Sequence, residues 1–371
     1  MTQARGPRVA IVHDYITQRG GAERVVLALA AAFPGAPLHT SLYAPDGTFP
    51  EFAELDVRAM AMNHVGVLRN HHRLALPLLA PAFSRLRVEA DVVICSSTGW
   101  AHGAHASGRT IVYCHSPARW LWAKDQYLPA GSSIVKRATL GALERQLRAW
   151  DMRAAARADR YVVNSTLIHD RVKQAYGIEA EILPPPFTLP VDGPQRAPLP
   201  GLDPGFFMCV SRLMSYKNVR QVVEAFAALP DQRLVVVGTG PDEAAVRAAA
   251  GPNASFTGTV GDAELAWLYS NAAGLVVAAY EDFGITPLEA AAFGVPVAAL
   301  RWGGFLDTIR EGVTGVYLDR PEPDAIRDAV KTLLDRKWDR AVLVAHAATF
   351  SAPRFTARIR SIVDEELAVR S

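Results

Sequence analysis

The sequence of 371 residues predicts an α/β protein with two doubly wound domains, each a parallel sheet between layers of helices. Short apolar runs alternate with helical patterns over most of the chain. The runs are apolar throughout rather than at every second residue, which is typical of strands that are buried on both faces. A proline-rich stretch over 184–204 interrupts the alternation and indicates a linker. We therefore expect two Rossmann-like domains that face a central cleft, with ligands at the carboxyl ends of the strands.

The N-terminal domain is expected to span residues 1–187. Its predicted strands cover 8–13, 37–43, 91–95, 110–114, 160–164 and 179–183. The helical segments between them cover 21–33, 73–83, 133–158 and 167–176.

The second domain is expected to span residues 188–350 and starts the alternation again. Its predicted strands cover 206–210, 233–237, 254–257, 274–278, 295–299 and 315–318. Its helices include 219–228, 242–249, 262–270, 287–293 and 323–334. A last helix over 354–367, within residues 351–371, is additional to this pattern.

Composition narrows the class of protein. Half of the residues are hydrophobic and a fifth are charged, as in a globular chain. No run of about 18 uncharged apolar residues predicts a membrane span, and the apolar stretch near the N-terminus is too short for a secretory signal. The three cysteines, Cys95, Cys114 and Cys209, lie in apolar runs without a C-x-x-C pair. We interpret them as reduced core residues of a cytoplasmic protein, without a structural zinc site.

Positive charge is concentrated in the first half of the chain. Residues 1–187 hold 21 Lys and Arg against 15 Asp and Glu, whereas residues 188–371 hold 18 against 22. Two stretches, 58–87 and 131–160, combine arginines with apolar residues. Such stretches suit a peripheral contact with an anionic membrane or a lipid-linked substrate, and they also suit solvated helix faces over a core. Nucleic acid is disfavoured because the aromatic interleaving of its binding proteins is missing.

Glycines follow the first predicted strand. Gly20 and Gly21 precede a helical pattern, so the backbone there can approach an anion at a helix N-terminus, although a plain loop explains them equally well. The G-x-G-x-x-G fingerprint of a nicotinamide site is absent, which disfavours a dehydrogenase.

Two motifs in the second half carry charges suited to a nucleotide sugar. Arg212 and Lys217 follow the strand over 206–210 and can grip a diphosphate as a planar fork and a point charge, unless they are solvated loop cations. The run from Glu281 through Phe283, Gly284, Ile285 and Thr286 to Glu289 follows the strand over 274–278 and enters a helix. We expect Thr286 as its N-cap and Pro287 at its first position, with the amides of residues 284–286 aimed at phosphate oxygens. The carboxylates of Glu281 and Glu289 can accept hydrogen bonds from sugar and ribose hydroxyls.

A histidine ends another strand. His115 comes after the apolar run over 110–114 and precedes the aromatic sequence Arg119-Trp120-Leu121-Trp122. A single histidine is often structural, but this position favours a site residue.

These motifs in this order resemble those of the retaining family-4 glycosyltransferases of the GT-B fold. The opening Val12-His13-Asp14-Tyr15 with Gly20 and Gly21, and Cys114-His115-Ser116-Pro117, look most like the bacterial GDP-mannose-dependent mannosyltransferase branch. The resemblance runs from about residue 9 to residue 334. It departs at Phe350-Ser351-Ala352, where the family often has Phe-Ser-Trp.

The resemblance implies a role for each residue. Arg212 and Lys217 would bind the donor diphosphate, Glu289 the ribose, and Glu281 with the turn of Phe283, Gly284, Ile285 and Thr286 the transferred sugar. His115 would contact the 6-hydroxyl of that sugar. Gly20 and Gly21 would approach the diphosphate, the base would lie near Val260, and the last helix would return to the N-terminal domain.

The implied reaction is transfer of a hexose, mannose from GDP-mannose in the first hypothesis, to a sugar or a polyprenyl- or lipid-linked acceptor in glycan or glycolipid assembly. No second carboxylate is evident as a nucleophile, which favours front-face attack with retention, and no metal or cofactor is expected. A UDP- or dTDP-sugar transferase that acts on a small natural product stays open, as does a catalytically silent nucleotide-binding protein. The acceptor, the linkage and the oligomeric state are not indicated.

Overall fold

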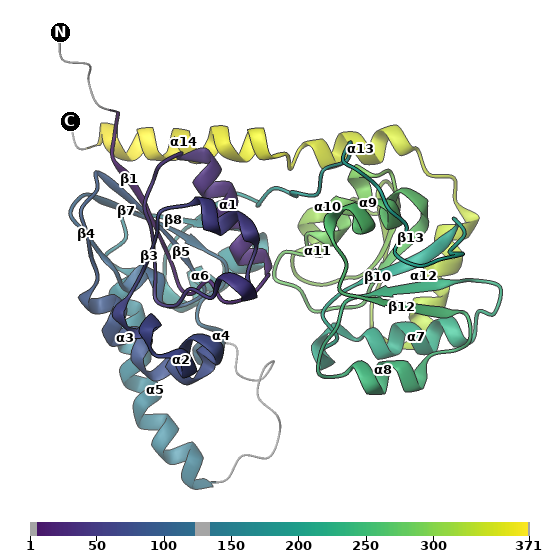
Figure 1. The fold of residues 1–371 in the computed structure, drawn as a ribbon, viewed down its shortest axis with the longest axis horizontal. Coiled ribbons are helices and arrows are strands. Elements are labelled where there is room, and N and C mark those ends of the chain that lie inside the picture. Colours follow the sequence, from purple (N-terminus) through teal and green to yellow (C-terminus); the bar gives the residue numbers. More distant parts are fainter. Residues whose placement is uncertain (1–5, 123–133, 370–371) are drawn as a thin grey trace. The chain divides into compact units, whose positions relative to one another are not determined.

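The computed structural model describes residues 6–122 and 134–369 and divides into two compact units (Figure 1). The N-terminal unit runs up to Pro185 and resumes at Ala352, and the C-terminal unit is Pro186–Ser351. Each unit is a parallel sheet covered by helices, so the predicted fold class is confirmed. Among the described residues, no helix is both long enough and apolar enough to cross a membrane.

The N-terminal unit has a seven-stranded sheet in the order β3-β2-β1-β5-β7-β8-β9. Every neighbouring pair is parallel. Its strands are β1 (Val9–His13), β2 (Leu38–Thr40), β3 (Val57–Ala59), β5 (Val92–Ser97), β7 (Arg109–Cys114), β8 (Arg160–Val163) and β9 (Glu181–Ile182). A separate pair joins β4 (Arg87–Val88) to β6 (His105–Ala106).

The helices of this unit are α1 (Gly21–Ala32), α2 (Gly66–Asn70), α3 (Leu76–Arg85), α4 (Arg119–Trp122), α5 (Ile134–Ala155), α6 (Thr166–Tyr176) and α14 (Ala352–Ala368). Its short 3₁₀ turns are η1 (Pro45–Gly47), η2 (Pro50–Glu54), η3 (Ala61–His64), η4 (His72–Ala75) and η5 (Ala101–Gly103). Local chemistry sets the ends of α6. Ser165 Oγ accepts from the amide of Ile168 at its start, and Gly177 with φ of 70° ends it.

The central strand β5 shows why the strands are apolar throughout. Val92 and Ile94 join one core cluster and Val93 and Cys95 join another, because successive side chains point to opposite faces of the sheet. All six residues of β5 are buried. The three cysteines are buried free thiols, as predicted, and burial raises the pKa values of Cys95 and Cys209 to about 12.

The C-terminal unit has a six-stranded sheet in the order β12-β11-β10-β13-β14-β15, again parallel throughout. Its strands are β10 (Phe206–Val210), β11 (Leu234–Val237), β12 (Ala254–Gly258), β13 (Ala272–Val277), β14 (Val297–Leu300) and β15 (Gly315–Leu318). Its helices are η7 (Ser215–Lys217), α7 (Val219–Ala227), α8 (Glu243–Ala249), α9 (Asp262–Asn271), α10 (Thr286–Ala292), α11 (Phe305–Thr308), α12 (Pro323–Asp335) and α13 (Arg340–Ala348).

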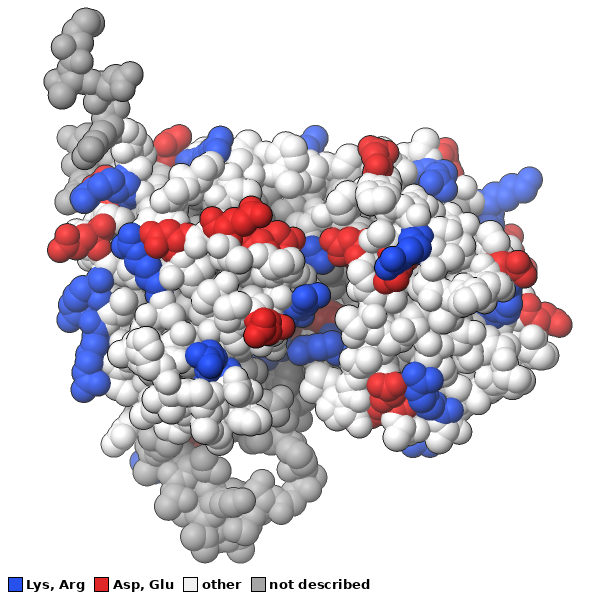
Figure 2. All heavy atoms as spheres, viewed as in Figure 1, with Lys and Arg blue, Asp and Glu red and all other residues white. Residues whose placement is uncertain are grey.

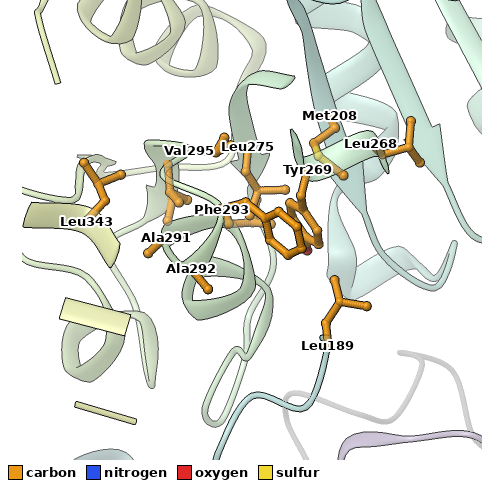
Figure 3. Packing of buried hydrophobic residues seen from close by; sticks show 14 of the residues in the cluster. Leu189, Met208, Leu268, Tyr269, Leu275, Ala291, Ala292, Phe293, Val295 and Leu343 are labelled. Carbon is orange, nitrogen blue, oxygen red and sulfur yellow. The ribbon is translucent and has the colours of Figure 1, made fainter. Parts of the chain in front are cut away.

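One core cluster of this unit lies under α9 and α10 (Figure 3). The rings of Tyr269 and Phe293 stack there with centroids 5.6 Å apart, and Met208 of β10 and Leu275 of β13 contribute from the sheet. The opposite face is covered by a second cluster that includes Phe207 and Cys209. Both faces of β10 are therefore buried, as in the N-terminal unit.

The helix α14 packs on the N-terminal unit, where Phe355, Ile359, Ile362 and Val363 join a core cluster of that unit. The ring of Phe355 lies edge-on to that of Tyr113, with centroids 5.9 Å apart. An aromatic anchor is therefore present three residues beyond Ala352, although the Phe-Ser-Trp pattern is absent.

The structure differs from the predicted elements mainly in short pieces. The strands β3, β4 and β6 and the helices α2, α4, α11 and α13 were not predicted, because pieces of two to five residues have no measurable periodicity and α13 carries apolar residues on much of its surface. Residues 131–133 of the predicted basic stretch lie outside the described residues.

Candidate active site

The predicted site residues lie at or beyond the carboxyl ends of strands in their own units. Gly20, Gly21 and His115 belong to the N-terminal unit, and the other nine belong to the C-terminal unit. Each unit therefore carries its own set of candidate residues at the carboxyl ends of its strands.

An ion pair joins two of the predicted residues of the C-terminal unit. Lys217, in the turn after β10, donates from Nζ to Oε1 of Glu281, which follows β13. The strands β10 and β13 are neighbours in the sheet, so the loops at their carboxyl ends meet. The Lys217 side chain is 8% exposed and that of Glu281 is 32% exposed. A cation and a hydrogen-bond acceptor are thus held together at the carboxyl ends of the two central strands.

Two further hydrogen bonds fix these loops to each other. Asn218 has φ of 52° and donates from Nδ2 to the carbonyl oxygen of Ala278 over 2.7 Å. The amide of Tyr280 donates to the carbonyl oxygen of Tyr216 over 3.2 Å. Sequence analysis did not single out Asn218. Its signal is its residue type, because asparagine tolerates left-handed backbone better than most side chains.

Arg212 lies on the same loop as Lys217 but remains exposed. Its Nη2 lies 3.4 Å from the hydroxyl of Tyr216, and Lys217 Nζ lies 5.0 Å from the centroid of the same ring. The structure therefore brings both cations to Tyr216. The neighbouring loop after β11 packs closely against this segment, since a Cβ on Gly238 would lie 2.1 Å from the carbonyl oxygen of Ser211.

The turn before α10 differs from its prediction by one residue. Ile285 is the N-cap, Thr286 is the first helical residue and Pro287 the second, because the carbonyl of Ile285 already accepts from the amides of residues 288 and 289. Phe283 is buried, and Gly284 has φ of 77° with Phe305 packed where a Cβ would point. Within the described chain, the amides of residues 284–286 donate to no backbone carbonyl. The backbone of the described chain therefore supplies no acceptor for these three amides.

Glu289 is buried in the first turn of α10, with 6% of its surface exposed. Its Oε2 accepts a hydrogen bond of 2.9 Å from the hydroxyl of Tyr269 on α9. Burial, with the negative charge of Glu289, raises the pKa of Tyr269 well above 10, so the phenol stays a donor. Sequence analysis missed Tyr269, because a tyrosine in an amphipathic helix looks like any other core residue.

Val260 follows β12 and is partly buried against the core cluster under α9. The neighbouring loops after β11 and β12 approach each other where Thr239 Oγ1 and Thr259 Oγ1 lie 3.5 Å apart. Val260 follows the carboxyl end of β12, and Lys217 and Glu281 follow the carboxyl ends of β10 and β13. The strand β12 lies two strands away from β10 in the parallel sheet.

In the N-terminal unit, His115 follows β7 and is 7% exposed. Its Nε2 lies 2.8 Å from Ser96 Oγ on β5, and its ring lies 6.3 Å from that of His13 on β1. Burial lowers the pKa of His115 to about 3, and the nearby His13 and Arg119 add to this shift. His115 is therefore a neutral imidazole at physiological pH.

Asp14 is a buried structural centre that sequence analysis did not assign. Its carboxylate accepts from the amides of Thr98, Trp100 and Ala101 over 2.6, 3.2 and 2.5 Å. The residue thus fixes the turn after β5. Its position directly after the first strand was the available signal.

Gly20 is the N-cap of α1 and Gly21 its first residue. A Cβ on Gly20 would lie 2.6 Å from Oε2 of Glu23, whereas a Cβ on Gly21 would meet no atom within 4 Å. The atom near Gly20 is the end of a flexible side chain that can move, so packing within the described structure requires a glycine at neither position. Among the residues with described positions, no group of three or more His, Cys, Asp or Glu is placed to hold a metal ion.

Comparison with known proteins identifies the family. A sequence profile described as "Glycosyltransferase Family 4" matches residues 19–188, and one described as "Glycosyl transferases group 1" matches residues 195–349. The GDP-mannose-dependent alpha-(1-6)-phosphatidylinositol monomannoside mannosyltransferase of Mycolicibacterium smegmatis is 30% identical over 362 residues, which cover 87% of this chain and 88% of that protein.

Other relatives match over shorter regions. The D-inositol 3-phosphate glycosyltransferase of Corynebacterium glutamicum is 32% identical over 187 residues, 43% of each chain. For that protein and several like it, the match spans about half of the relative's length or less. Among solved structures, the Anabaena protein HepE in complex with UDP-glucose has a TM-score of 0.71 at 16% identity and covers 96% of this chain and 99% of its own, which shows a shared fold. The profiles, the full-length relative and the two parallel-sheet units together place this chain in the family-4 glycosyltransferases of the GT-B fold.

Proposed function

We propose that the chain is a retaining, metal-independent mannosyltransferase that moves mannose from GDP-mannose to a sugar or lipid-linked acceptor in glycan or glycolipid assembly. The observation that carries this proposal is the Lys217–Glu281 ion pair beside Arg212 and the turn of residues 284–286. These groups lie at the carboxyl ends of the strands of one sheet. The cations and amides suit the phosphates of a nucleotide sugar, and the carboxylate suits its hydroxyls.

The cations account for the leaving group. As the bond to the sugar breaks, negative charge grows on the diphosphate, and Arg212 and Lys217 stabilise that charge electrostatically. The amides at the start of α10 can contribute further donors to the phosphates. These groups supply the positive potential for which other transferases use a metal ion.

The carboxylates account for the sugar and the ribose. Glu281 is one-third exposed and can exchange its bond to Lys217 for sugar hydroxyls. Glu289 is held by Tyr269 and would accept from ribose hydroxyls. With no second carboxylate assigned as a nucleophile, we propose attack on the face from which the diphosphate leaves, with a phosphate oxygen taking the acceptor proton.

The names of relatives favour GDP-mannose as donor. The Mycolicibacterium relative and a Corynebacterium glutamicum protein that is 40% identical over 111 residues (30% of this chain and 26% of that protein) are both named GDP-mannose-dependent. The HepE structures contain UDP or UDP-glucose, so a UDP- or dTDP-sugar donor is the second hypothesis. The loop at Val260 would decide between the bases.

A patch on the N-terminal unit suits a lipid-linked acceptor. Val65, Val67, Leu74 and Leu78 are each about half exposed, between 48% and 61%. They lie within the stretch 58–87, which holds five arginines and no acid. Figure 2 shows basic side chains gathered along the left edge of this unit, near β4 and α3. We propose that this patch makes a peripheral contact with the anionic cytoplasmic face of a membrane, and that the arginines of residues 144–160 in the second basic stretch add positive charge to it.

Calorimetric titration with GDP, UDP, dTDP and NAD, without added metal, tests the donor. Tight binding of GDP alone supports the proposal, and binding of UDP or dTDP instead moves it to the second hypothesis. Transfer from GDP-mannose to polyprenyl-linked sugars, followed by NMR of the product, then tests retention: an inverted anomeric centre would contradict it. Binding of no nucleotide would favour a catalytically silent protein.

Liposome sedimentation tests the membrane contact. Binding should require anionic lipid, fall with salt, and weaken in a Val67→Ser, Leu74→Ser variant. A matched Val342→Ser, Val344→Ser variant, which removes exposed valines from α13 of the other unit, should bind normally.

A further inference from the structure

The polar cluster at the ends of β1, β5 and β7 determines which nitrogen of His115 carries a proton. We propose that the Ser96 hydroxyl holds His115 in the neutral tautomer protonated at Nδ1, so that Nδ1–H is the donor that His115 offers to a substrate. Ser96 is then a positioning residue. The tautomer follows from hydrogen bonds alone, and the role of the donor rests on the proposed function.

The argument begins at His13. Its Nδ1 lies 2.9 Å from the carbonyl oxygen of Ser96. A carbonyl oxygen can only accept, so Nδ1 of His13 carries a hydrogen in both the neutral and the charged form of the ring. The same nitrogen lies 3.1 Å from Ser96 Oγ, which therefore faces an N–H and acts as an acceptor toward it.

This leaves one acceptor for the hydrogen of the Ser96 hydroxyl. Ser96 is 0% exposed, and its Oγ contacts two groups of the described chain, His13 Nδ1 and His115 Nε2. Since His13 Nδ1 already carries a hydrogen, the hydroxyl donates to His115 Nε2 over 2.8 Å. The reverse arrangement would leave a buried hydroxyl without an acceptor and is disfavoured by about five- to hundredfold.

The other ring nitrogen then carries the proton of a neutral His115. Burial, His13 and Arg119 keep the ring uncharged by lowering its pKa to about 3. Within the described chain, Nδ1 donates to no protein group, and it is not among the atoms that are sealed from solvent without a hydrogen bond. It is an accessible N–H that fits an oxygen acceptor, such as a sugar hydroxyl.

Nitrogen NMR of the full chain measures the tautomer directly. Protein labelled with ¹⁵N-histidine gives different long-range ¹H–¹⁵N patterns for the two neutral forms, and a His115→Gln variant assigns the signals. We expect the Nδ1–H pattern for His115 between about pH 6 and pH 8. In Ser96→Ala, we expect the Nε2–H form to rise from a minor species to one comparable with the Nδ1–H form.

The neighbouring serine provides a matched control. Ser97 Oγ lies 2.9 Å from Nδ1 of a different histidine, His102, and is equally buried. Ser97→Ala should therefore alter the His102 signals and leave those of His115 unchanged. Ser96→Thr, which retains the hydroxyl, should keep the His115 pattern of the parent chain.

The parent spectrum alone can overturn the proposal, even if Ser96→Ala fails to fold. An Nε2–H or charged His115 in the parent contradicts it, as does a Ser96→Ala spectrum with an unchanged tautomer. With GDP-mannose, Ser96→Ala should lower kcat by about tenfold and Ser96→Thr should restore it. A chain that shows the expected tautomer but transfers no sugar from any nucleotide would refute the proposed function and leave the tautomer assignment intact.

Discussion

Replacing Glu281 with glutamine should tighten nucleotide binding while it removes transfer. Glu281 forms an ion pair with Lys217, so a diphosphate must displace a carboxylate before it can bind that cation. Two unit charges about 4 Å apart attract by about 1 kcal/mol in water and about 4 kcal/mol at an effective dielectric constant of 20. With Lys217 8% exposed and Glu281 32% exposed, we place the competing interaction at about 1–3 kcal/mol.

Since 1.4 kcal/mol corresponds to tenfold in affinity, Glu281→Gln should bind GDP about fivefold tighter or more. Guanosine, which has no diphosphate, should bind equally to both proteins. Transfer should fall by at least about a hundredfold, because the carboxylate that would accept hydrogen bonds from the hydroxyls of the transferred sugar is lost. Glu224→Gln, which removes an exposed ion pair to Arg220, is the calorimetric control. Unchanged or weaker GDP binding in Glu281→Gln would refute the competition.

Four other outcomes are expected. Tyr269→Phe removes the donor to buried Glu289 and should lower stability by about 1–3 kcal/mol in urea titrations, with weaker nucleotide binding; unchanged stability would contradict the hydrogen bond. Because the folded pKa of His115 is about 3 and its ordinary value is 6.5, the unfolded chain binds more protons between these values, so stability should decline as pH falls below about 6.5, and less so in His115→Gln. Gly21→Ala should leave the melting temperature unchanged but raise KM for the donor, and normal kinetics would exclude a ligand there. Phe355→Ala should destabilise the N-terminal unit by about 3–5 kcal/mol in chemical denaturation. A loss below about 1 kcal/mol would contradict the contribution of α14 to that core.

Both sheets could be predicted because each long strand is marked by an apolar run within its own few residues. The strand Phe206–Val210, for example, is an unbroken apolar run, and the two core clusters that share its side chains confirm that both of its faces are buried. Short strands such as β3, with three half-buried or exposed residues, carry no such pattern. Burial on both faces is thus what made a strand recognisable in the sequence.

The contacts of the site were less predictable than its residues. The meeting of Lys217 with Glu281 follows from the adjacency of β10 and β13, which sequence alone does not give. The bond from Tyr269 to Glu289 joins two helices, and the chain from His13 through Ser96 to His115 crosses three strands. Such contacts depend on the order of strands in the sheet and on side-chain rotamers. The periodic patterns of apolar residues in the sequence indicate neither.

The return of α14 inverts the order in which the two units can be completed during synthesis. The C-terminal unit is continuous from Pro186 to Ser351, whereas the N-terminal unit is complete only once α14 has been synthesised. Glu366 of α14 pairs with Arg109, 257 positions earlier in the chain. Until that helix has been made, the apolar surface that receives Phe355 and Ile359 stays uncovered on the nascent chain. The later-made unit can therefore close first, and the earlier-made one depends on a long-range contact that slows folding and exposes it to aggregation.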